Sequence, residues 1–143
     1  MQEAFARMDE LAGEGRLTEA SRDWMAFFAA DDEMGELEAA GYFEASGRYV
    51  PNLLEEIRQV LVSDEPGPTD PSVLAAITVP VLVLHGSRLT LDWYRDGIRH
   101  VAAHVADAEA REIAGAAHFA PWLRPQPVVD ELVRFFAGQP ALA

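Results

Sequence analysis

The sequence contains no cysteine among its 143 residues. Disulfide bonds, thiolate metal sites and cysteine nucleophiles are therefore all excluded. Any covalent catalysis by this chain would have to use an oxygen or a nitrogen nucleophile.

Basic residues are also scarce. The chain has 11 Lys plus Arg against 24 Asp plus Glu, which gives a formal net charge of −13. Such a charge repels phosphate backbones and anionic lipid surfaces. We therefore expect no nucleic acid and no membrane surface among its partners.

Long apolar runs are missing as well. The longest mostly apolar stretch covers residues 73–84 and is interrupted by Thr78 and Pro80. It falls short of the ~20 residues that cross a bilayer, so no transmembrane helix is predicted. The first residues have neither a basic region nor an apolar signal core, which indicates a cytoplasmic protein.

What the chain does have is enough apolar residues for a core of ordinary size, at 50% of its length. Three prolines and a glycine within residues 63–71 interrupt any regular element there. We therefore expect two segments, a helical one over residues 1–70 and a second one over residues 71–143.

The first segment is predicted to be helical throughout. A first helix follows from apolar residues at helical spacing, namely Phe5, Met8 and Leu11. A second is expected to begin with Thr18 as its N-cap and to place Trp24, Phe27 and Phe28 on one face. A short third helix should follow residues 31–32, and a fourth should begin at Pro51. The apolar face predicted for this fourth helix consists of Leu53, Leu54, Ile57, Val60 and Leu61.

The second segment changes to a strand pattern. Residues 79–85 are a near-continuous run of β-branched and aliphatic residues, typical of a strand buried on both faces. A helix from about Thr90, a weaker strand over residues 110–114 and a last helix opened by Pro125 should follow. The inward residues expected on the last helix are Val128, Val129, Leu132, Phe135 and Phe136.

This order predicts an α/β fold in which a helical layer precedes a βαβα unit with parallel strands. A two-stranded parallel sheet leaves its edges and its apolar faces uncovered. We therefore expect the sheet to continue in another polypeptide segment or in a second copy of the chain.

Three blocks of the second segment together resemble the C-terminal end of α/β-hydrolases. They are residues 77–86, ending in Leu-His-Gly, residues 113–121, which read Ile-Ala-Gly-Ala-Ala-His-Phe-Ala-Pro, and residues 125–136. The resemblance implies a partial α/β-hydrolase fold in which residues 1–70 form the lid. It also implies that His118, in the Gly-x-x-His loop that starts at Gly115, is the catalytic histidine.

The remaining catalytic groups of that family are not evident. The family nucleophile lies on a Gly-x-Ser-x-Gly turn, and none of the five serines has this context. Many members carry an acid three residues after the strand-end glycine, where this chain has Leu89. Asp92, further along in the next helix, is the remaining candidate for the acid.

The other site predictions concern binding. Trp24, Phe27, Phe28 and Trp122 are candidates to line an apolar substrate pocket, although aromatic residues at helical spacing also form cores. His100 and His104 stand four residues apart, but no further ligand completes a metal shell, so they are interpreted as surface histidines. We expect no metal and no cofactor.

Two hypotheses of function follow. In the first, the chain belongs to an α/β-hydrolase that cleaves a small apolar ester, a lactone or a related bond, and is inactive alone because its nucleophile is missing. A variant of it places the serine and the oxyanion donors on a separate complementing chain. In the second, the chain is a non-catalytic module that binds a small molecule or dimerises through its exposed sheet edge.

Overall fold

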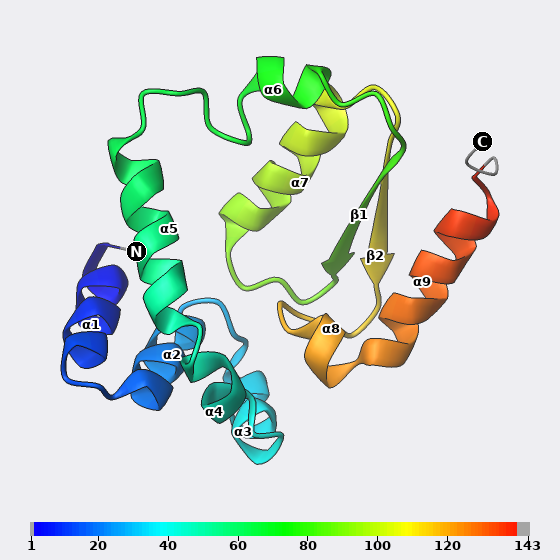
Figure 1. The fold of residues 1–143 in the computed structure, drawn as a ribbon. Helices are drawn as coiled ribbons and strands as arrows, with labels where there is room; N and C mark the ends of the chain where they lie inside the picture. Colours follow the sequence, from blue (N-terminus) through cyan, green and yellow to red (C-terminus); the bar gives the residue numbers. More distant parts are fainter. Residues whose placement is uncertain (1, 140–143) are drawn as a thin grey trace. The chain divides into compact units, whose positions relative to one another are not determined.

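A computed structural model describes residues 2–139 and divides the chain into two compact units between Glu65 and Pro66. This division lies inside the expected linker, residues 63–71. The described residues are mostly helical, with one two-stranded parallel sheet (Figure 1). None of the helices in this range is long and apolar enough to cross a membrane.

The first unit consists of helices packed around one apolar core. Its elements are α1 (Gln2–Gly13), α2 (Leu17–Ala26), α3 (Asp31–Ala39), α4 (Tyr42–Gly47) and α5 (Val50–Val62). Helices α1, α2 and α5 contact one another and enclose this core. Its buried residues are Met8, Leu11, Ala20, Trp24, Val50 and Leu54.

Helix α2 begins and ends earlier than its sequence predicts. The expected cap at Thr18 is wrong, because the N–H of Ala20 already donates to the carbonyl oxygen of Arg16 at 2.9 Å. Thr18 therefore lies inside the helix. At the other end, Phe27 and Phe28 follow the last helical residue in a tightened turn, rather than continuing the helical face of Trp24.

The apolar face predicted for α5 is correct only in its first half. Leu54 is buried and Leu53 and Ile57 pack against the core, whereas Val60 and Leu61 are 66% and 72% exposed. Val60 and Leu61 are not among the residues that pack on the core formed by α1, α2 and α5.

Helix α4 was not predicted, and it packs closely against α2. A Cβ atom at Gly47 would lie 3.0 Å from backbone atoms of Leu17 and Thr18, so the lack of a side chain permits this approach. The Ser21 and Ser46 hydroxyl oxygens are 2.7 Å apart, and the Ser46 hydroxyl also donates to the carbonyl oxygen of Tyr42. This hydrogen bonding satisfies the buried hydroxyl of Ser21.

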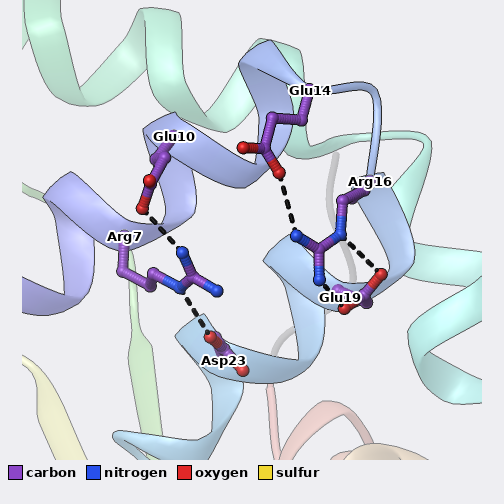
Figure 2. A network of polar contacts seen from close by, with 6 residues as sticks. All are labelled: Arg7, Glu10, Glu14, Arg16, Glu19 and Asp23. Carbon is purple, nitrogen blue, oxygen red and sulfur yellow. Dashed lines mark hydrogen bonds and ion pairs between the residues drawn. The ribbon is translucent and has the colours of Figure 1, made fainter.

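Ion pairs also join α1 to α2, as Figure 2 shows. The Arg7 guanidinium lies 2.6 Å from Glu10 in its own helix and 3.5 Å from Asp23 in α2. Arg16, just before α2, binds Glu14 and Glu19. These side chains are about half exposed, and such pairs contribute only up to ~1 kcal/mol each.

The second unit contains the parallel strand pair. Its elements are α6 (Pro71–Ala75), β1 (Val81–Gly86), α7 (Asp92–His104), β2 (Ala108–Ile113), α8 (Ala120–Leu123) and α9 (Pro125–Ala137). The predicted parallel pairing is confirmed, with Val81 opposite Ala108 and Gly86 opposite Ile113. Helix α7 contacts both strands and α9 contacts β2, and the two helices flank the strand pair in Figure 1.

Strand β1 is not buried on both faces as its composition predicts. Its residues from Val81 to His85 are half-buried, and Gly86 alone is buried. The last helix shows the same discrepancy, because Val129, Leu132 and Phe136 were expected to point inward but are 46%, 38% and 67% exposed. Two strands provide too little sheet surface to cover these residues.

Candidate functional site: the histidine loop and its pocket

The loop that carries His118 is held against the end of β1 by hydrogen bonds between its backbone and residues 87–88. The N–H groups of Ser87 and Arg88 donate to the carbonyl oxygens of Ile113 and Ala116, at 3.1 and 2.9 Å. The Ser87 hydroxyl in turn accepts from the N–H of Gly115 at 2.9 Å. The position of His118 is therefore tied to that of β1.

Two glycines make this arrangement sterically possible. Gly115 has φ +72°, in the left-handed region that favours glycine. Gly86 has no such angle, but a Cβ atom there would lie 2.2 Å from the carbonyl oxygen of Ala116. The histidine loop thus passes directly over the last residue of β1.

A pocket of about 280 Å3 opens beside this loop at the carboxyl end of both strands. Ligand pockets in α/β proteins commonly occupy this end of a parallel sheet. The lining is mostly apolar and consists of Leu84, His85, Gly86, Leu89, Tyr94, Ile98, Ile113, Ala117, His118, Ala120, Pro121 and Val128.

His118 is half-buried in the wall of this pocket and lies between two aromatic rings. The centroid of its imidazole is 5.0 Å from that of Tyr94 and 5.0 Å from that of Phe119. Tyr94 stacks in turn on Trp93 at 4.1 Å. Helix α7 therefore limits how far the imidazole can turn.

Burial raises the pKa of Tyr94 to about 12. The phenol is neutral at physiological pH with or without this shift, and burial extends the neutral form to more alkaline pH. The sequence predicts Tyr94 only as an apolar-face residue of α7, at helical spacing from Ile98. His85, at the end of β1, also lines the pocket.

The pocket lining contains no carboxylate side chain among the described residues. Asp92, the candidate acid, is exposed in the first turn of α7 and is not part of the lining. Leu89, three residues after the last residue of β1, presents an apolar side chain to the pocket. The described lining of the pocket thus contains the imidazole of His118 but no carboxylate.

The four aromatic candidates for substrate binding lie in different places. Trp24 is 8% exposed in the core of the first unit, with Phe28 against it in an edge-to-face contact at 5.3 Å. Phe27 is half-buried beside Phe28. Trp122 belongs to the second unit, where it is 47% exposed next to Pro121, which lines the pocket.

The two histidines on α7 are hydrogen-bonded to main-chain groups. His100 Nε2 lies 2.8 Å from the carbonyl oxygen of Thr69, and His104 Nδ1 lies 2.8 Å from that of His100. Within the described residues, no group of three or more His, Asp or Glu residues is placed to hold a metal ion. The contact of His100 with Thr69 therefore connects α7 to the start of α6, because Thr69 directly precedes Asp70, the N-cap of α6.

Searches for related proteins returned no matching protein-family model, no matching curated protein and no matching solved structure.

Proposed function

We propose that this chain is part of an α/β-hydrolase-type enzyme, and that the complete enzyme cleaves a small apolar ester, a lactone or a related bond. His118 would take the proton of a serine hydroxyl and later return it to the leaving group. The observation that carries the proposal is the loop of His118, tied to β1 by hydrogen bonds and opening onto an apolar pocket.

The charge and shape of the site support this role. The lining of Leu84, Leu89 and Ile98 favours an apolar substrate. Imidazole is the usual proton carrier near neutral pH.

The nucleophile has to come from elsewhere. Ser87 is the serine tied to the histidine loop, but its hydroxyl accepts the hydrogen bond from Gly115 and is absent from the pocket lining. The proposal therefore expects a Gly-x-Ser-x-Gly turn and its oxyanion donors in another polypeptide segment. The coding sequence next to that of this chain is the first place to look for it.

The purified chain is expected to show no sustained hydrolysis of p-nitrophenyl acetate or butyrate above the rate of its His118→Ala variant. The reason is that a histidine without a nucleophile and without oxyanion donors lacks the groups that provide most of the rate enhancement. Release of p-nitrophenolate, followed over many turnovers, provides the measurement.

His100→Ala serves as the matched control, because His100 lies outside the pocket. A sustained rate of ester hydrolysis that is lost in His118→Ala and kept in His100→Ala would contradict the prediction that this chain lacks the nucleophile. It would require a serine or a water mechanism within this chain.

A second candidate function is a module that pairs through the free edge of β1. The N–H groups of Val81 and Ser87 donate toward β2, to Asp107 and Ile113. Because successive residues of a strand alternate, Leu82 and Leu84 direct their backbone groups away from β2. An apolar strand with such an open edge can pair with a second copy of itself.

For this second candidate, the chain is expected to dimerise and Leu82→Pro to return it to a monomer. Proline removes an outward N–H of β1 and leaves the bonds to β2 in place. Each copy carries a formal charge of −13, so added salt should increase the dimer fraction. Sedimentation velocity at two salt concentrations measures both effects.

Leu82→Val is the control, since it keeps the N–H and a strand-forming side chain. A monomer at all salt concentrations would contradict pairing through β1, and so would a dimer that persists in Leu82→Pro.

A further inference from the structure

A second hollow, more open and of about 270 Å3, adjoins the pocket of His118. It shares His85 and Ile98 with that pocket, and the other two residues that line it are Arg95 and Arg99. Apolar and basic surfaces therefore meet where β1 ends and α7 passes it.

Arg95 differs from the other arginines of this acidic chain. Seven of the eleven form ion pairs with carboxylates, namely Arg7, Arg16, Arg22, Arg58, Arg99, Arg111 and Arg134. Arg48 lies over the ring of Tyr49, and Arg88 and Arg124 have contacts of their own. Arg95 is the arginine for which the described part of the chain provides no side-chain hydrogen bond, ion pair or ring contact.

The charge of the hollow is therefore available to a ligand. Asp96 is one turn from Arg99 and already binds it at 2.8 Å, which leaves Arg95 as the main cationic group. The imidazole of His85 adds a second hydrogen-bonding group to the same lining. A planar guanidinium matches a carboxylate through two parallel hydrogen bonds.

We propose that the pocket and the hollow together bind one small molecule, with its apolar body in the pocket and a carboxylate group on Arg95. This inference rests on the proposed function in one respect, namely that the bond to be cleaved lies near His118. It adds that the substrate is an ester or a lactone that also carries a free carboxylate.

Binding of 3-phenylpropionate and of its uncharged analogue 3-phenylpropanamide tests the proposal by isothermal titration calorimetry at pH 7 and low salt. The carboxylate is expected to bind about fivefold more tightly than the amide, which is the size of one exposed ion pair. Arg95→Gln should reduce this ratio to about one by weakening only the carboxylate.

Arg134→Gln removes the same charge from an exposed position on α9 and should keep the fivefold ratio. Equal affinities in the wild type would overturn the proposal, as would a ratio that persists in Arg95→Gln or a failure of both probes to bind. The readout is binding, so a failure of the hydrolase proposal in the ester assay leaves this result unchanged.

Discussion

Replacing Gly86 by alanine is expected to destabilise the second unit by about 3 kcal/mol or more. The added Cβ atom would lie 2.2 Å from the carbonyl oxygen of Ala116 and 2.7 Å from that of Ala117. Both atoms belong to the backbone, so no side-chain rotation can relieve the overlap. The histidine loop would have to move away from β1 and give up the hydrogen bonds that hold it.

Hydrogen exchange at the amides of Val81, Ser87 and Gly115 provides the measurement, because these groups are bonded only while β1, β2 and the loop stay together. The variant should exchange them at least about a hundredfold faster, as a loss of about 3 kcal/mol implies.

Gly97→Ala is the matched control within the same unit. Gly97 lies inside α7, and a Cβ atom there meets nothing within 4 Å. Alanine should therefore stabilise the helix by about 0.5–1 kcal/mol. Normal protection of the three amides in Gly86→Ala would show that the close contact is not part of the folded state.

Trp24→Ala is expected to cost the first unit about 3–5 kcal/mol, the range for removing a buried aromatic side chain. Trp24 is 8% exposed in the core formed by α1, α2 and α5, and its ring contacts Phe28. A folded unit of this size is only marginally stable. Urea unfolding followed by far-ultraviolet circular dichroism should show the loss as a lower midpoint.

Trp122→Ala makes the same replacement at an indole that is 47% exposed, and should cost less than about 1 kcal/mol. The comparison of these two variants also tests the prediction that both tryptophans bind substrate. If Trp24→Ala kept the stability of the wild type, the indole would not be a core group, and the pocket interpretation of Trp24 would gain support.

The element types could be predicted because they depend on local pattern. Residues 79–85 favour a strand whatever surrounds them, and Tyr94 and Ile98 recur at helical spacing. The short helices α4, α6 and α8 were not predicted, because segments of six, five and four residues carry too little periodic signal.

The candidate site was predictable only in part for a similar reason. His118 could be identified from the local Gly-x-x-His context. Arg95 could not be identified in this way, because it differs from the other arginines in having no ion-pair partner among the described residues. Which arginine pairs with which carboxylate, as Arg99 does with Asp96, depends on side-chain geometry. His85 was placed at a strand end, but its exposure to the pocket depends on where α7 lies.

By itself, the sequence determined the acidic charge, the absence of thiol chemistry, the helix-rich first segment and the pair of strands in the second. These properties follow from composition and from periodicity over a few turns. Only the tertiary structure decided that Gly86 lies under the histidine loop, that Tyr94 contacts His118, and which apolar residues stay exposed. Such facts depend on the distances between segments remote in the chain, which no local pattern encodes.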